Sequence, residues 1–186
     1  MQKIILASQS PRRKQLLEWA GIPFDVLVKE TDESYPPNLP LEEIAIHIAR
    51  NKALVIKETN VVIFPILAAD TIVVLQNEII GKPRDREDAV NILSRLSGKQ
   101  HEVITGVVIL YNEKEIAFSE TTVVQFHNLS LSQIEFYVDH YKPYDKAGAY
   151  AIQEWIGVVG IKSVTGDFYN VMGLPVSRVV QALQNL

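Results

Sequence analysis

The segment that follows the apolar run at residues 4–7 carries hydroxyl and guanidinium groups close together. Ser8, Ser10, Arg12 and Arg13 stand where a predicted strand leads into a predicted helix. Free N–H groups at a helix N-terminus, its positive end and arginine side chains are groups that bind phosphate. The spacing therefore predicts an anion site. The alternative is that Ser10 only caps the helix and that the arginines are solvated surface charges.

A second candidate is Asp70 with Thr71, which follows the apolar run at residues 61–69. That run predicts a buried strand ending at Asp70. A carboxylate at such a position is costly unless it binds a cation or a reacting water, so Asp70 could hold Mg²⁺ or act as a general base. The alternative is an aspartate that pairs with an arginine or caps a turn.

A third candidate, Lys82, lies in the string Gly81-Lys82-Pro83. The string is similar to part of a phosphate-binding P-loop, but Gln76 and Pro83 stand where that motif needs glycine and a hydroxyl. A P-loop nucleotidase is therefore excluded. Lys82 could still bind phosphate as a point charge, and a plain surface lysine is the alternative.

A fourth candidate is the stretch that begins at Asp145 and Lys146 and ends at Gln153. The small residues at 147–149 allow a ligand to approach closely, and the Gln153 amide can both donate and accept, as recognition of a base edge requires. A surface strand residue is the alternative for Gln153. For residues 166–175 we predict a packed turn and a helix entry.

Helical and strand-like periodicities alternate along the chain and predict an α/β or α+β fold with a mixed sheet. An exposed loop rich in proline and acids is expected at residues 31–40. The expected strands cover residues 4–7, 24–28, 61–69, 72–75, 78–80, 102–111, 115–126 and 158–164. The expected helices cover residues 11–19, 41–57, 86–96, 131–141 and 176–186.

Composition bounds the class of protein. The 186 residues suit one domain over residues 1–186, and a net charge of −4 argues against a nucleic-acid partner. The absence of cysteine excludes disulfides, thiolate metal sites and cysteine nucleophiles. The N-terminal apolar run at residues 4–7 is shorter than a signal peptide core, and no apolar run reaches the length of a membrane span, so we expect a cytoplasmic protein with no membrane partner.

Taken together, these strings resemble the Maf family of nucleoside triphosphate pyrophosphatases, also called septum formation inhibitor proteins. They occur in the family's order across nearly the whole chain. The matching strings are LASQSPRR at 6–13, ADT at 69–71, GKP at 81–83, LSG at 96–98 with His101, DKAGAY at 145–150 with Ile152-Gln153, and GLP at 173–175.

The resemblance implies an elongated mixed central sheet with flanking helices, and two lobes around a cleft. It also implies hydrolysis of a nucleoside triphosphate between the α and β phosphorus atoms with the help of a divalent cation, Mg²⁺ or Mn²⁺. Asp70 falls on the family's proton acceptor. Arg12, Thr71 and Gln153 fall on positions linked to substrate choice, in the combination of the dTTP/UTP branch. A homodimer is the expected assembly.

A mechanism consistent with both lines of argument assigns a role to each candidate. Glu33, in the acidic loop, and Asp70 would hold the cation, with Asp70 also deprotonating the attacking water. Ser8 and helix N–H groups would hold phosphate oxygens. The groups expected to neutralise the triphosphate are Arg12, Arg13, Lys52 and Lys82, and those expected to close the opposite wall are Asp145 and Lys146.

The main alternative is a non-catalytic nucleotide-binding regulator of cell division, which the septum-related name suggests. The presence of Asp70, Lys82 and Gln153 argues against it, because a pure binding protein needs no base beside its basic residues. Turnover of nucleotide discriminates between the two hypotheses.

Overall fold

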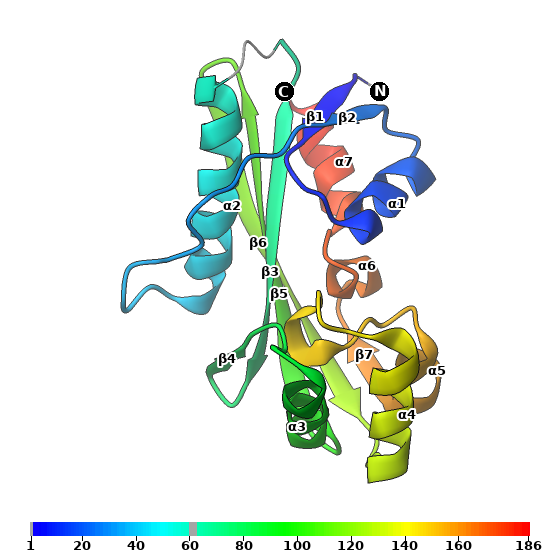
Figure 1. The fold of residues 1–186 in the computed structure, drawn as a ribbon. Helices are drawn as coiled ribbons and strands as arrows, with labels where there is room; N and C mark the ends of the chain where they lie inside the picture. The colour runs from blue at the N-terminus through cyan, green and yellow to red at the C-terminus, as the bar shows by residue number, and fades with distance from the viewer. Residues whose placement is uncertain (1, 60–62) are drawn as a thin grey trace. The chain divides into compact units, whose positions relative to one another are not determined.

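The fold, taken from a computed structural model that describes residues 2–59 and 63–186, is mixed α/β (Figure 1). Within these residues the strands form one seven-stranded sheet in the order β2-β1-β3-β5-β6-β7, with β4 paired to β3. Strand β1 runs parallel to β2 and β3, whereas β4 is antiparallel to β3 and β7 is antiparallel to β6. The predicted mixed sheet with flanking helices is confirmed.

The chain divides into two compact units, in agreement with the two lobes that the sequence predicts. Unit 1 comprises Met1–Thr71, Thr105–Glu120 and Gly173–Leu186, and unit 2 comprises Ile72–Ile104 and Thr121–Met172. Three strands contribute residues to both units: β3 (Ile66–Leu75), β5 (Gln100–Tyr111) and β6 (Lys114–Phe126).

In unit 1, helices cover the strands from both sides, with α2 on one side and α1 and α7 on the other (Figure 1). Ser10 caps α1 and Pro11 occupies its first turn, as predicted. The remaining elements of unit 1 are β1 (Ile4–Leu6), α1 (Pro11–Trp19), β2 (Phe24–Val26), α2 (Leu41–Thr59) and α7 (Val176–Gln184).

Helix α2 packs unusually close to the sheet, because small residues line the contact. Ala45, Ala49 and Ala53 recur every fourth residue on one side of the helix and are fully buried. Gly106 of β5 faces this stripe, and a Cβ atom there would lie 2.2 Å from the Ala45 carbonyl carbon. Any larger residue at 106 would push α2 away from the sheet, and Lys52 of α2 would move with it.

In unit 2, a β-hairpin and short helices surround the shared strands. The hairpin of β3 and β4 turns at Gln76 and Asn77, both of which have positive φ, as two-residue hairpin turns commonly require. Asp85 caps α3, and Ser130 caps α4 in a capping box with Gln133. The remaining elements are β4 (Glu78–Ile80), α3 (Arg86–Leu96), α4 (Leu131–Tyr141), the 3₁₀ helix η1 (Ala147–Ala149), α5 (Trp155–Gly160), β7 (Ile161–Thr165) and α6 (Phe168–Val171).

The predicted end of the central strand is wrong. Strand β3 begins at Ile66, after Pro65, and continues through Asp70 to Leu75, so Asp70 lies inside the strand. The β-branched residues that follow Thr71 extend the ladder, and the Asp70 carboxylate is tolerated because a lysine partners it. Residues 61 and 62 of the predicted strand lie outside the described part of the chain.

The predicted strand at residues 158–164 is also partly wrong, because its first three residues belong to helix α5. The helix packs so tightly that a Cβ atom on Gly157 would lie 1.7 Å from the Ile152 carbonyl oxygen. The β-branched Val158 and Val159 face solvent, where a short helix tolerates them. Their apolar, β-branched character resembled that of a buried strand.

Candidate active site

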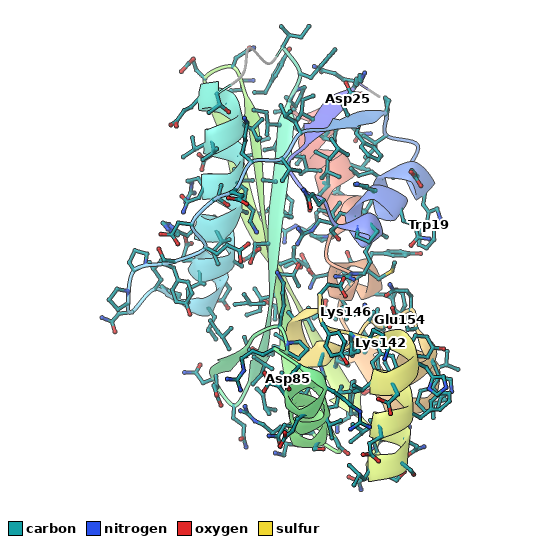
Figure 2. The ribbon with its side chains drawn as sticks, in the orientation of Figure 1. Trp19, Asp25, Asp85, Lys142, Lys146 and Glu154 are labelled. Atoms are coloured by element: carbon teal, nitrogen blue, oxygen red, sulfur yellow. The ribbon has the colours of Figure 1, made fainter. Side chains whose placement is uncertain are left out.

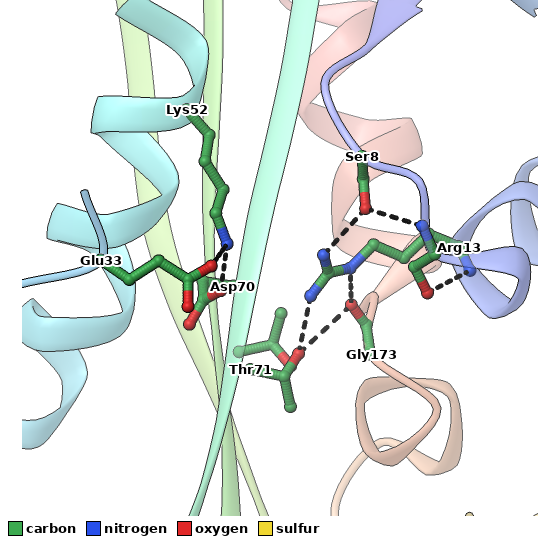
Figure 3. A network of polar contacts seen from close by, with 9 residues as sticks. Ser8, Arg13, Glu33, Lys52, Asp70, Thr71 and Gly173 are labelled. Atoms are coloured by element: carbon green, nitrogen blue, oxygen red, sulfur yellow. Dashed lines mark hydrogen bonds and ion pairs between the residues drawn. The ribbon is translucent and has the colours of Figure 1, made fainter. Parts of the chain in front are cut away.

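Two carboxylates of unit 1 converge on one ammonium group (Figure 3). Lys52 Nζ lies 2.6 Å from Asp70 Oδ1 and 2.7 Å from Glu33 Oε1. Asp70 projects from β3 and Lys52 from α2, while Glu33 comes from the acidic loop that precedes α2. The side chains of Asp70 and Lys52 are only 16% and 18% exposed, whereas that of Glu33 is 53% exposed. The carboxylates therefore already surround a cation position.

The donor set of this cluster fits a hard divalent cation. Among the described residues, no group of three or more histidine, cysteine or acidic side chains could hold a metal ion. Mg²⁺ in nucleotide enzymes is commonly bound by one or two carboxylates, while substrate phosphates and waters supply the other ligands. Glu33 and Asp70 meet that requirement, since both already direct an oxygen toward the same positive charge.

A second network of unit 1 is centred on the buried guanidinium of Arg13. Its nitrogens donate to the Gly173 carbonyl oxygen at 2.8 Å, to Ser8 Oγ at 3.1 Å and to Thr71 Oγ1 at 3.1 Å. Burial lowers the pKa of the Arg13 guanidinium, and the charge of Asp70 opposes that shift. The guanidinium thus joins the segment after β1, strand β3 and the turn before α7.

These two networks lie on opposite sides of β3 (Figure 3). Asp70 and Thr71 are consecutive strand residues, so their side chains point to opposite faces. Three of the five N–H groups of Arg13 are committed to protein acceptors rather than to a phosphate. Arg13 instead holds Ser8 and Thr71 in place.

The Ser8 hydroxyl is prepared to donate. Its oxygen accepts the Ser10 backbone N–H at 3.2 Å and a guanidinium N–H of Arg13 at 3.1 Å. With both lone pairs engaged, the hydroxyl interacts with a further group through its proton, which suits a phosphate oxygen. Arg12, the next predicted anion ligand, is partly exposed at the start of α1.

In unit 2, the segments of Lys82 and Lys146 are hydrogen-bonded to each other. The Gly148 N–H donates to the Gly81 carbonyl oxygen at 3.2 Å, and Gly148 has a φ of 69° and packs against Val73. Lys82 is exposed, one residue beyond this bond. The structure therefore brings together the segments of two lysines that are far apart in the sequence.

Lys146 is held by two carboxylates, and Figure 2 labels this lysine and one of the two acids, Glu154. Its Nζ lies 2.8 Å from Asp145 Oδ1 and 3.7 Å from Glu154 Oε1, and its side chain is only 10% exposed. Gln153, next to Glu154, is exposed on a turn closed by a hydrogen bond from the Glu154 N–H to the Ala151 carbonyl oxygen. Gln153 lies in a turn, so its interpretation as a surface strand residue is wrong.

The family model for Maf-like proteins matches residues 3–186 of this chain. The chain belongs to the Maf-like protein family. Among the curated relatives of this Maf-like chain, a protein of Cytophaga hutchinsonii named dTTP/UTP pyrophosphatase is 51% identical over 98% of this chain and 84% of its own length. A protein of the same name from Parabacteroides distasonis is 47% identical over 98% of this chain and 95% of its own length.

The solved Ham1 protein of Staphylococcus aureus has a TM-score of 0.44 and 12% identity over 67% of this Maf-like chain and 71% of its own chain. Within residues 2–59 and 63–186, no helix has both the length and the apolar character needed to cross a membrane.

Two residues beside Gln153 in unit 2 were missed by sequence reasoning. Glu154 and Tyr137 contact each other and the turn that bears Gln153. Tyr137 lies within a predicted helix, and its position gave no signal. Glu154 gave a weak signal, because it is a carboxylate next to Gln153, the candidate for base recognition.

Beside this turn, His101 forms a buried aromatic cluster with Tyr150 and Phe126. His101 Nε2 lies 2.7 Å from the Tyr150 hydroxyl, and the three rings make edge-to-face contacts. Burial lowers the pKa of His101 from 6.5 to about 4. Tyr150 directly follows η1, so the cluster anchors the loop that carries Lys146.

The His101 shift predicts acid sensitivity of the Maf-like fold. Between pH 6.5 and 4 the unfolded chain binds a proton at His101 that the folded chain excludes, so stability falls as the pH is lowered through that window. The shift corresponds to a loss of about 3 kcal/mol. Urea unfolding at several pH values should show a smaller loss in His101→Gln than in the parent, and no such difference in His127→Gln at an exposed position. Equal pH profiles for His101→Gln and the parent would contradict the assignment.

Proposed function

We propose that this Maf-like protein is a dTTP/UTP pyrophosphatase that hydrolyses the bond between the α and β phosphates, releasing the monophosphate and pyrophosphate. The names of the full-length relatives at 47–51% identity support the substrate. The observation that carries the chemistry is the pair of carboxylates, Glu33 and Asp70, converging on one cation position.

Glu33 and Asp70 would hold a divalent cation, Mg²⁺ or Mn²⁺, in this proposal. Such a cation, when bound, supplies neutralising charge to the phosphate oxygens and to the leaving pyrophosphate. Before a cation binds, Lys52 keeps the two carboxylates oriented, because its ammonium contacts one oxygen of each. It also provides positive charge beside the reacting phosphate.

Asp70 acts as the general base. Its carboxylate orients a water molecule and accepts a proton from it as the water oxygen bonds to the attacked phosphorus and the P–O bond to the leaving group breaks. The base is held on a buried strand and by Lys52. A base so fixed needs little reorganisation at the moment of reaction.

The remaining candidates bind and select the nucleotide. Ser8 and the N–H groups of α1 donate to phosphate oxygens, and Arg12 adds positive charge there. Arg13 and Thr71 support this phosphate position, because Arg13 donates hydrogen bonds to the hydroxyls of both Thr71 and Ser8. In unit 2, Lys82 and Lys146 contribute positive charge, Asp145 orients Lys146, and Gln153 recognises the base edge.

The test is product analysis with a panel of nucleoside triphosphates, in the presence of Mg²⁺ or Mn²⁺ and after chelation. We expect pyrophosphate and monophosphate from dTTP and UTP, with little turnover of purine nucleotides and none after chelation. Release of orthophosphate in place of pyrophosphate would contradict the proposed bond. Saturable binding without turnover would favour the nucleotide-binding regulator.

A further inference from the structure

The hydroxyl of Tyr137 contacts both ends of the turn that presents Gln153. Tyr137 lies on α4 with its side chain fully buried. Its phenolic oxygen donates to Glu154 Oε2 and accepts the backbone N–H of Ala151 at 3.1 Å. One buried oxygen therefore joins the first and last residues of the turn.

The turn has little other freedom. The Glu154 N–H closes it by donating to the Ala151 carbonyl oxygen at 3.1 Å, and Ile152 inside it is buried. Gln153 is the one residue of the four that is exposed. The exposed Gln153 side chain is therefore carried on a backbone that the buried Tyr137 hydroxyl holds in place.

Such support matters for an amide that recognises a base. A glutamine amide can rotate by half a turn and exchange its donor and its acceptor, so by itself it matches the edge of uracil or that of cytosine. Discrimination between them requires the amide to be held in one orientation and position, within about 0.5 Å. The backbone that carries Gln153 must therefore be fixed.

We propose that Tyr137 is a positioning residue that sets pyrimidine selectivity by fixing the turn of Gln153. The inference rests on the proposed function and adds to it a residue that touches no substrate. Without the hydroxyl, the buried Ala151 N–H loses its acceptor and Glu154 loses its donor. The turn would then relax, and Gln153 would move with it.

The first measurement compares kcat/KM for UTP with that for CTP, because these substrates differ only at the base edge. In Tyr137→Phe we expect the UTP/CTP ratio to fall by about tenfold or more, since small displacements of a positioning group cost up to about a hundredfold. The control is Tyr141→Phe on the same helix. The Tyr141 ring stacks on that of Tyr137 at a centroid distance of 5.0 Å and is partly exposed, so the ratio should not change.

A double-mutant cycle with Gln153→Ala separates positioning from general damage. If Tyr137 acts through Gln153, Tyr137→Phe should lower the ratio in the parent and leave it unchanged in the Gln153→Ala background. An equal fall in both backgrounds would overturn the inference, as would an unchanged ratio in the parent. Absence of UTP hydrolysis by the parent itself would overturn the proposed function and this inference together, so the two failures are distinguishable.

A second variant serves if Tyr137→Phe does not fold. Glu154→Ala removes the carboxylate that Tyr137 contacts and leaves the buried ring intact. Its effect on Lys146 is the same for UTP and CTP, which carry the same triphosphate, so the ratio reports only on the turn. We expect Glu154→Ala to lower the UTP/CTP ratio in the parent and to leave it unchanged in the Gln153→Ala background. An unchanged ratio in the parent would overturn the inference.

Discussion

Replacing Asp70 by asparagine should lower kcat for dTTP and UTP by about 10²–10⁴-fold, the range that a general base contributes. Asparagine keeps the shape of the side chain and an oxygen for Lys52, so we expect the fold to be retained. It cannot accept a proton from water, and it removes one negative charge from the cation position. Steady-state kinetics at saturating Mg²⁺ or Mn²⁺ checks the expected loss.

The control for Asp70 is Asp25→Asn. Asp25 is an exposed aspartate of the same unit, where it pairs with Lys3 at 2.8 Å. Its replacement should leave kcat unchanged and alter stability by less than about 1 kcal/mol. An Asp70→Asn protein that folds, binds the nucleotide and retains the parent's kcat would rule out Asp70 as the base.

Replacing Arg13 by leucine should destabilise the protein by about 3–5 kcal/mol, the range for removing one partner from a buried network of charged and hydrogen-bonded groups. The Gly173 carbonyl oxygen and the Thr71 and Ser8 hydroxyls would each lose a buried donor. Urea unfolding of the purified variant measures the loss directly. Activity should fall as well, since Ser8 and Thr71 would no longer be held.

Arg12→Leu, one residue earlier, is the matched control. Arg12 is partly exposed, so its loss should change the free energy of unfolding by about 1 kcal/mol or less, the range for an exposed charge. It should instead raise the KM for nucleotides, because Arg12 is proposed to bind phosphate. If the two variants have equal stability, the structural role assigned to Arg13 is wrong.

Local signals predicted the elements that begin or end at a distinctive residue. The expected helices at 11–19, 86–96 and 131–141 begin directly after their caps, Ser10, Asp85 and Ser130. The hairpin turn, which contains Asn77, lies between the expected strands at 72–75 and 78–80. Each of the three capping side chains accepts the backbone N–H of the residue three positions later. Information that is local in sequence could therefore be used without a structure.

Other features depended on contacts that are distant in sequence. Arg13 and Gly173 are 160 residues apart, and Lys52 is 18 residues from Asp70. The sequence contains these groups but does not reveal which of them lie on the same face of a strand. In the structure, Arg13 and Lys52 lie on opposite sides of β3 (Figure 3). The resemblance to a family supplied their grouping, whereas the structure supplied their partners.

Charge counting at the cluster of Lys52, Glu33 and Asp70 links the binding of substrate to that of metal. One lysine and two carboxylates carry a net charge of −1, so the cluster alone repels a triphosphate. A divalent cation would change this sum to +1 and make the same surface attractive. Metal and nucleotide should therefore bind synergistically, and thermodynamic reciprocity requires each to raise the affinity of the other by the same factor.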